Sequence, residues 1–137
     1  MAEKTTLHLD IVTPDKNLYS GRVARVSIPT VDGEIGVLPG HADLMARLGC
    51  GVLTLTDTDG NERRFFCRDG FVEVKGEDTS VLADVAESEG EIDTGRAERA
   101  KLRAEQRLGS GAPDIDYSRA AASLYRALQR LGATRPR

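Results

Sequence analysis

Hydrophobic and polar positions alternate along the chain up to about residue 85. Leu7, Leu9 and Ile11 recur at every second position, and Val23 and Ile28 mark a second short apolar stretch. A period of two is typical of strands that bury one face. The pattern therefore predicts one strand over residues 5–12 and another around residues 23–28.

Two hairpins are predicted in the same half of the chain. Residues 51–56 and 63–67 flank the Asp59-Gly60 pair, and Asp-Gly supplies the positive φ that a tight hairpin turn needs. Residues 71–75 and 80–85 flank a second turn over residues 76–78. Short strands at this spacing, with no helix between them, favour a β-sandwich or barrel.

The apolar period changes near residue 87 from two to the helical value. Ala97, Ala100, Ala104 and Leu108 are three or four residues apart, which puts them on one face of a helix, and Asp93 is placed to cap its start. Small side chains on this face allow a second helix to approach closely. The Gly/Pro-rich residues 109–113 are expected to end this helix.

A second helix is predicted after the break, with Asp114 or Asp116 as its cap and Gly132 as its stop. Its expected apolar face consists of Tyr117, Ala120, Leu124, Leu128 and Leu131. Two capped helices joined by a short loop form an antiparallel hairpin. We therefore expect a β domain over residues 1–87 and a helical hairpin over residues 88–137.

The two parts differ in charge, although the whole chain of 137 residues has a net charge of only −3. Residues 1–91 hold nine basic and 17 acidic side chains, whereas residues 92–137 hold ten basic and five acidic ones. Nine of those ten are arginines, whose planar guanidinium suits carboxylates and phosphates. An anionic partner is one interpretation, and a solvated helix face is the other.

The spacing of the arginines makes the first interpretation specific. Arg119, Arg126 and Arg130 are separated by seven and four residues, so they share one face of the second helix. The first helix has a similar row, formed by Arg96, Arg99, Arg103 and Arg107. A folded hairpin would bring the two rows together on one polyanion, whereas extended helices would form a long basic rod.

Several function classes are excluded or disfavoured. No apolar run approaches the roughly 20 residues that span a bilayer, which excludes an integral membrane protein. His8 and His41 have no cysteine or carboxylate at a ligand spacing, so no metal site is expected. Nucleophile-elbow and phosphate-loop motifs are missing from the sequence. We therefore expect no catalytic residue, no enzymatic activity of the chain alone, and free thiols at Cys50 and Cys67.

One segment resembles a known family. The run Asp32-Gly33-Glu34-Ile35-Gly36-Val37-Leu38-Pro39-Gly40-His41-Ala42, the Val81-Leu82-Ala83-Asp84 run and the Ile92-Asp93-Thr94-Gly95-Arg96-Ala97 run resemble motifs of the epsilon subunit of bacterial F-type ATP synthase. Their order and spacing match that family from about residue 5 to residue 131. The first of these runs is very specific to the family.

The resemblance implies a fold and a place in a complex. It implies a ten-stranded N-terminal β-sandwich followed by the two-helix hairpin. In that family the sandwich sits on the central rotor stalk, contacts the gamma subunit and the membrane-embedded c-ring, and helps to couple proton flow to rotation. The implied location is peripheral, at the cytoplasmic face of the bacterial plasma membrane. The loop that carries Glu34 and His41 resembles the part that faces the foot of the stalk and the ring.

The resemblance also implies a regulatory role for the helices. In the family they switch between a compact hairpin and an extended form that reaches the beta and alpha subunits and inhibits ATP hydrolysis, and Arg119, Arg126 and Arg130 would make those contacts here. No cofactor is required, but ATP binds the compact hairpin in some members as a regulatory ligand. The corresponding nucleotide contacts fall on six positions: Glu87, Asp93, Arg96, Arg103, Arg126 and Arg130.

Two other functions remain as alternatives. One is a free-standing nucleotide-sensing module, in which the β domain only supports an arginine-lined ATP site. The other is nucleic-acid binding by the basic hairpin, which the acidic sequence pI of about 5.4 disfavours because the β domain would repel phosphate. Stable association with other ATP synthase subunits would distinguish the rotor interpretation from the sensor.

Overall fold

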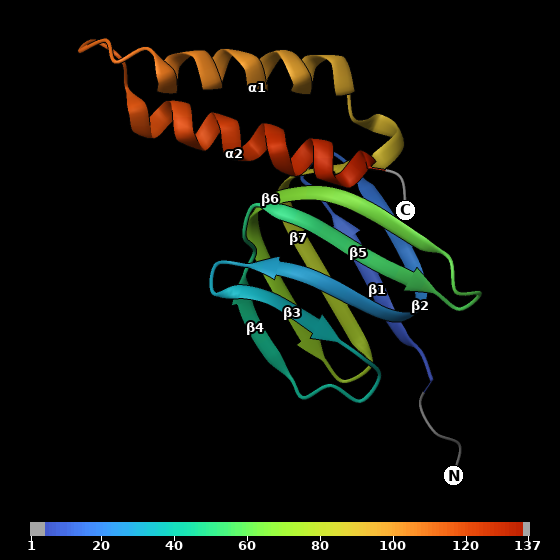
Figure 1. Cartoon of the computed structure of the whole chain (residues 1–137). Coiled ribbons are helices and arrows are strands. Elements are labelled where there is room, and N and C mark those ends of the chain that lie inside the picture. The colour runs from blue at the N-terminus through green and yellow to red at the C-terminus, as the bar shows by residue number, and fades with distance from the viewer. Residues whose placement is uncertain (1–4, 136–137) are drawn as a thin grey trace.

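The structure is a computed structural model that describes residues 5–135 and consists of a β-barrel followed by two helices (Figure 1). Within these residues there are seven strands, one short 3-10 helix and two α-helices: β1 (Leu7–Val12), β2 (Asn17–Thr30), β3 (Gly33–Val37), β4 (Leu44–Arg47), β5 (Gly51–Asp57), β6 (Glu62–Lys75), β7 (Asp78–Ser88), η1 (Glu89–Glu91), α1 (Thr94–Gly109) and α2 (Tyr117–Thr134). The predicted mainly β domain with two following helices is confirmed.

Five strands close into a ring. The neighbours run β1-β7-β6-β5-β2, and β2 pairs back with β1. The β1–β7 pair is parallel, whereas the other pairs are antiparallel. β3 adds to β2, and β4 adds to β6. Because the ring is closed, each of these five strands is hydrogen-bonded to a neighbouring strand on both sides, and the core lies inside the ring.

The count of ten strands is not confirmed, because long strands bend and serve two neighbours. β2 pairs with β1 up to Val23 and with β5 from Val23 onward, and the β2–β5 pairing has a register shift between Val23 and Arg25. β6 pairs with β5 up to Cys67 and with β4 from Phe71 onward. Each long strand is therefore continuous, although its two halves lie on different sides of the barrel.

The predicted alternation fills the barrel. Leu9, Ile11, Leu53 and Phe65 are fully buried, as expected for the inward face of strands with period two. The first predicted hairpin joins β5 and β6, and Gly60 has a φ of +86° in its turn. The second joins β6 and β7. Local sequence patterns therefore predicted both hairpins correctly.

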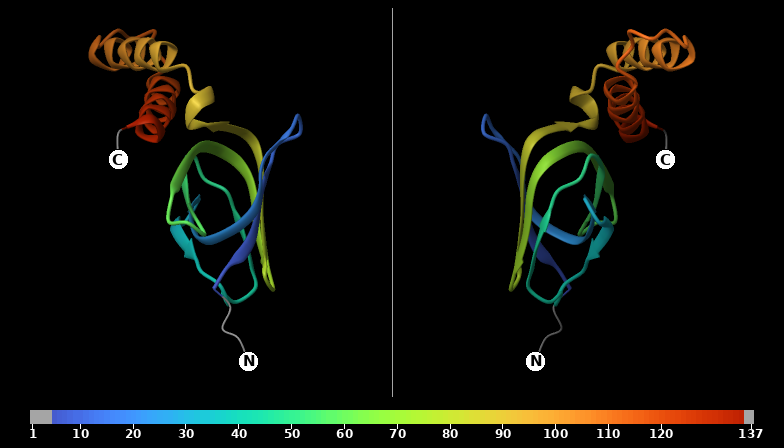
Figure 2. Two further views of the ribbon diagram at one scale, coloured as in Figure 1. Left: turned by 90° about the vertical axis from the view of Figure 1, so that its right-hand side faces the viewer. Right: turned by 90° about the vertical axis from the view of Figure 1, so that its left-hand side faces the viewer.

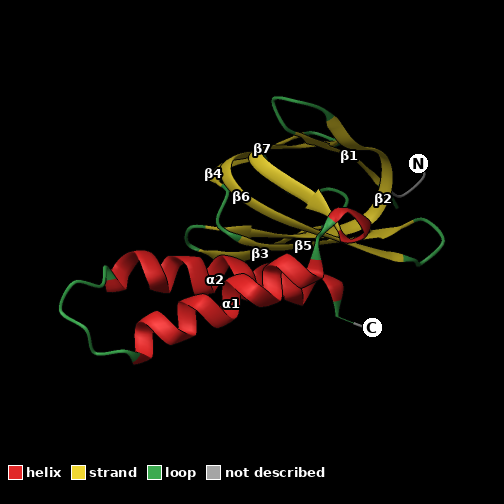
Figure 3. Ribbon diagram, turned by 90° about the horizontal axis from the view of Figure 1, so that it is seen from above, coloured by secondary structure: helices red, strands yellow, loops and turns green. Residues whose placement is uncertain are grey.

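The two helices lie side by side at the end of the barrel opposite the start of β1 (Figures 2 and 3). α2 faces the barrel, and α1 lies outside it (Figure 2). A second buried cluster joins Phe66 of β6, Ile92 of the link and Ala133 of α2. The loop between the helices projects beyond the barrel (Figure 3). The hairpin is therefore docked through the end of α2.

The apolar face predicted for the second helix is wrong in part. The buried residues of α2 are Ala120, Ala127 and Ala133, whereas Tyr117 and Leu128 are each 38% exposed. Alanines on both helices allow the backbones to approach closely, which leaves the larger side chains at the flanks. The predicted stop at Gly132 is also wrong, because α2 continues to Thr134 so that Ala133 can pack against Phe66.

The link between the two parts is short. β7 ends at Ser88, η1 follows, and α1 begins at Thr94. The division into residues 1–87 and 88–137 stays a prediction, and its ends, residues 1–4 and 136–137, lie outside the described residues. No helix within residues 5–135 is long and apolar enough to cross a membrane.

Candidate functional site

A pocket of about 410 Å³ lies between the two helices and the link to the barrel. All six residues that the family resemblance implies as nucleotide contacts line it. The full lining consists of Glu87, Glu91, Asp93, Arg96, Ala97, Ala100, Arg103, Ser123, Arg126, Ala127 and Arg130. Its volume is in the range of small-ligand sites. The structure therefore brings together residues that lie up to 43 positions apart in the sequence.

Helix capping and small residues build this pocket. The Asp93 side chain accepts a hydrogen bond from the backbone N–H of Arg96 at 3.0 Å, which confirms the predicted cap and fixes the start of α1. Ala97 is buried on α1 and Ala127 on α2, so the helices approach closely there. Arginines from both helices line the pocket beside these alanines.

Arg130 is the best-fixed cation in the pocket. Its Nε lies 3.2 Å from both carboxylate oxygens of Glu87, and its Nη2 lies 3.1 Å from Oε1. The guanidinium carbon also lies 4.3 Å from the ring centroid of Phe66, a distance at which a cation is attracted to an aromatic face. Arg130 therefore ties α2 to β6 and β7 as well as lining the pocket.

The other three arginines have no such anchor. Among the described residues, the guanidinium groups of Arg96, Arg103 and Arg126 make no hydrogen bond or ion pair with another side chain. Arg96 and Arg103 are exposed, and Arg126 is half-buried. Three unpaired cations beside one pocket give it a chemistry that suits an anion with several negative charges.

Glu91 adds an acidic group at the rim. Its carboxylate pairs with Lys16 of the barrel and accepts a hydrogen bond from the Ser88 hydroxyl at 2.7 Å. The hydrogen bond from Lys16 is the largest cause that lowers the pKa of Glu91, and that from Ser88 is the next. Burial opposes both in part. Glu91 is therefore ionised at neutral pH and ties the link to the loop after β1.

Replacing Lys16 by methionine is expected to raise the pKa of Glu91. A carboxyl whose pKa is lower in the folded than in the unfolded state stabilises the fold above the unfolded value, and this stabilisation is lost as pH falls through the folded pKa. The Lys16→Met variant should therefore be less stable than the original chain by about 0.5 kcal/mol near neutral pH, because the pair is exposed. This difference should vanish at about pH 2.

Titration of the Glu91 carboxyl by NMR, together with urea unfolding at both pH values, measures this effect. Lys101→Met is the matched control, because it removes the same kind of charge on α1, away from the Lys16–Glu91 pair. An unchanged pKa of Glu91 in Lys16→Met would contradict the expected role of the ion pair.

Sequence reasoning missed two polar residues of the pocket, Glu91 and Ser123. Ser123 lies three residues before Arg126 and seven before Arg130, so its helical spacing was a usable signal. The third arginine predicted to make inhibitory contacts lies outside this pocket. Arg119 shares the face of Arg126 and Arg130 but is exposed, nearer the start of α2, and does not line the pocket.

The two residues expected at the rotor interface lie apart from this pocket and from one another. Glu34 is near the start of β3, where its carboxylate accepts a hydrogen bond from Ser27, and it lines a groove beside Tyr125 of α2. His41 follows the end of β3, with its Nδ1 2.6 Å from the carbonyl oxygen of Ala42. Both lie on the outside of the barrel, Glu34 near the start of β3 and His41 beyond its end.

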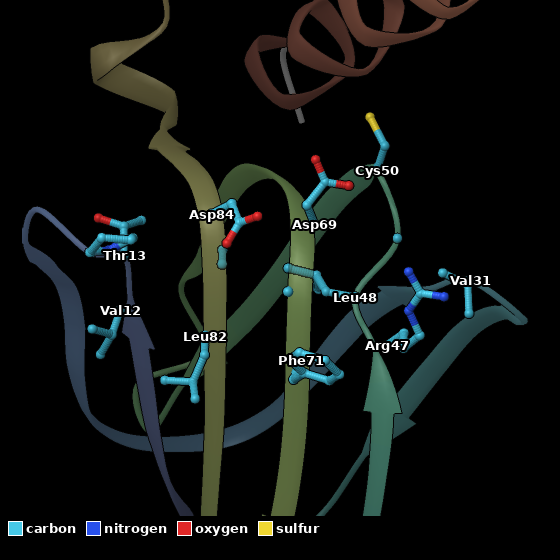
Figure 4. Close-up of a pocket in the computed structure, with 14 residues that line it drawn as sticks. Val12, Thr13, Val31, Arg47, Leu48, Cys50, Asp69, Phe71, Leu82 and Asp84 are labelled. Carbon is cyan, nitrogen blue, oxygen red and sulfur yellow. The ribbon is translucent and has the colours of Figure 1, made fainter.

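A second, larger cavity of about 720 Å³ opens on the side of the barrel (Figure 4). Phe71 of β6 and Leu82 of β7 are 52% and 50% exposed, and Val31 nearby is 56% exposed. Arg47 and Asp84 lie among them, so both signs of charge are present (Figure 4). Exposed apolar side chains with polar neighbours are typical of protein interaction surfaces.

The cysteines and histidines form no second chemical site. Burial raises the pKa of the Cys67 thiol to about 12 and also raises the pKa of Cys50. Both thiols are free, and a thiol with a raised pKa is a poor nucleophile at neutral pH. Within residues 5–135 no group of three or more metal-ligating side chains is found.

Chains in solved structures share this architecture. A chain in the structure of the Euglena gracilis mitochondrial ATP synthase, OSCP/F1/c-ring in rotational state 1, superposes with a TM-score of 0.82 and 21% identity, covering 98% of this chain and 85% of that one. A chain of the Tetrahymena thermophila mitochondrial ATP synthase central stalk/c-ring gives 0.58 and 17%, with 98% and 100% covered. At these identities the likeness shows a common fold.

Sequence comparisons show the family. Residues 6–89 match the family described as ATP synthase, Delta/Epsilon chain, beta-sandwich domain, and residues 91–135 match the corresponding long alpha-helix domain. The ATP synthase epsilon chain of Lawsonia intracellularis is 45% identical over 103 residues, or 75% of this chain and 77% of that one. The epsilon chain of Clostridium kluyveri is 43% identical over 108 residues, covering 79% and 80%. The chain with the arginine-lined pocket therefore belongs to the ATP synthase epsilon-chain family.

Proposed function

We propose that this chain is a rotor subunit of a proton-translocating F-type ATP synthase, with a helical hairpin that inhibits ATP hydrolysis and senses ATP. Family membership supports a non-catalytic subunit of that complex. The central-stalk assembly of the Tetrahymena relative supports a place on the stalk, peripheral to the membrane. The proposed location is the cytoplasmic face of the bacterial plasma membrane.

The barrel is the stalk-binding part of this proposal. The exposed Phe71 and Leu82 offer an apolar centre, and Arg47 and Asp84 offer a charged rim. An apolar centre with a polar rim is the usual anatomy of a stable protein interface. We assign this surface to the gamma subunit, and the outer side of the barrel along β3, with Glu34 near its start and His41 beyond its end, to the c-ring.

The hairpin is the regulatory part. The observation that carries this assignment is the convergence of Arg96, Arg103, Arg126 and Arg130 on one pocket at the junction between hairpin and barrel. ATP bound there would place its phosphates among the guanidinium groups. Asp93 would accept a hydrogen bond from the adenine amino group through the carboxylate oxygen that does not cap α1. Since both helices line the pocket, a bound nucleotide would hold them together and docked.

Direct binding measurements test this assignment. Replacing Arg126 by glutamine is expected to weaken ATP binding by about tenfold or more, because a charge-assisted contact to phosphate is lost. Isothermal titration of the full chain with ATP gives the dissociation constants. Arg119→Gln is the matched control, since Arg119 lies on the same face of α2 but outside the pocket. Equal losses in both variants, or no ATP binding at millimolar concentration, would contradict the proposed site.

The released hairpin is the inhibitory form in this proposal. Arg126 and Arg130 line the pocket while the hairpin is docked, so they reach acidic segments of the beta or alpha subunits only after release, together with Arg119. Family membership favours this arrangement over a free-standing nucleotide sensor. Co-purification with ATP synthase subunits separates the two functions, because a sensor would purify alone.

A further inference from the structure

One barrel side chain holds the C-terminal end of α2. Arg64 lies in β6, and its Nη1 donates to the carbonyl oxygen of Gly132 at 3.2 Å. Its Nη2 donates to the carbonyl oxygen of Arg135, the residue that caps α2. We propose that Arg64 is the latch of the helical hairpin, and that this guanidinium sets how often the hairpin leaves the barrel.

The chemistry of a helix end makes this contact strong. The last carbonyls of a helix lack intrahelical partners and carry a partial negative charge. α2 has no basic residue in its own last turn, so the barrel supplies the cation through Arg64. Hydrogen bonds from a charged donor are about twice as strong as neutral ones. The contact therefore stabilises the docked position of α2 against β6 and is lost when α2 leaves the barrel.

Burial places the guanidinium inside the interface between barrel and hairpin. The Nε atom of Arg64 is buried and has no hydrogen-bond partner among the described residues, so the group is not simply a solvated surface cation. In a partly buried site the screening by water is weaker than at an open surface. Loss of Arg64 would leave two helix-end carbonyls without their charged donor.

Arg64 also contacts the other end of the hairpin. Its backbone N–H donates to the Glu89 carboxylate at 3.1 Å, and Glu89 begins η1, which leads into α1. One residue therefore touches both the entry to the hairpin and its end. Arg130 and Ala133 dock on the neighbouring residue Phe66. Several anchors of the hairpin thus lie on this short part of β6.

This role goes beyond the proposed function, because it stands whether or not the pocket binds a nucleotide. Hydrogen exchange of the full chain, followed by mass spectrometry without any ligand, measures how often α2 opens. In the Arg64→Gln variant we expect the amides near the C-terminal end of α2 to exchange about tenfold faster, equivalent to about 1.4 kcal/mol. The amides of β5 should keep their original rates.

The neighbouring arginine provides the matched control. Arg63 lies beside Arg64 in β6, but its guanidinium carbon lies 5.4 Å from the ring centroid of Tyr19 and 5.2 Å from that of Phe65. Arg63→Gln removes the same charge from the same strand and is expected to leave α2 exchange unchanged. Acceleration of α2 by both variants alike would overturn the latch, because a general loss of charge would then explain it.

Unchanged α2 exchange in Arg64→Gln would also overturn the proposal. If that variant loosens the barrel strands as well, Arg64→Lys decides instead, because lysine keeps the charge but lacks the planar fork that reaches two carbonyls. Faster α2 exchange with an unchanged barrel in Arg64→Lys supports the latch. Rates equal to those of the original chain in both regions reject it.

Discussion

Replacing Gly70 by alanine is expected to destabilise the barrel by roughly 3–5 kcal/mol, the sum of overpacking and an unfavourable backbone conformation. A Cβ atom at this position would lie 1.9 Å from the carbonyl oxygen of Leu82, and Gly70 has a φ of +135°. Gly70 pairs with Ala83 where β6 and β7 run together. Since both strands belong to the closed ring, moving them apart would disturb the whole barrel.

Urea unfolding followed by circular dichroism measures this loss. Gly76→Ala is the matched control, because Gly76 also has a positive φ, of +60°, and joins the same two strands, but no atom lies within 4 Å of its added Cβ. That variant should lose only about 1 kcal/mol, the cost of a left-handed alanine. Equal losses at both positions would show that the close approach to Leu82 does not determine stability.

Removal of residues 92–137 is expected to abolish the inhibition of ATP hydrolysis while leaving stalk binding intact. The main core cluster of the barrel lies entirely within residues 7–86, so the remaining chain keeps its own core. Adding the full chain to the matching catalytic head with its gamma subunit should slow hydrolysis by roughly fivefold or more, the usual range for coupling between sites. Residues 1–91 alone should not slow it.

Salt provides the internal control for this experiment. If arginines of the hairpin pair with acidic segments of the head, added salt should weaken the inhibition by the full chain. Binding of both proteins to the stalk is measured in parallel by co-sedimentation. Loss of stalk binding in residues 1–91, or inhibition by that fragment, would contradict the division of labour between barrel and hairpin.

Sequence patterns predicted the local structure well, because hairpins and helix caps depend on neighbouring residues. Asp59-Gly60 forms the expected turn between β5 and β6, and Asp93 caps α1 as its position indicated. The arginine rows were also predictable, since helical spacing alone puts Arg126 and Arg130 on one face. For Arg96, Arg103, Arg126 and Arg130 to line one pocket, the hairpin then needed only to be folded.

Features that depend on distant contacts were not predictable from periodicity. The pairing of β2 with β1 closes the ring, but nothing in the alternation of Leu9 or Ile11 specifies the partner strand. Arg64 was not recognised because its partner Gly132 lies 68 residues away. The apolar face of α2 was misjudged for a related reason. Contact with Phe66 and with the alanines of α1 decides which of its residues are buried.

The docked hairpin behaves mechanically as a lever with its fulcrum at one end. The Arg130 side chain, the Gly132 carbonyl oxygen and the Ala133 side chain anchor α2 to the barrel near its C-terminal end, while the loop between the helices projects past the barrel (Figure 3). With 18 residues, α2 is about 27 Å long. A rotation of about 20° at the fulcrum would move the free tip by about 9 Å. A small rotation beside Arg130 is thereby amplified at the tip of the hairpin.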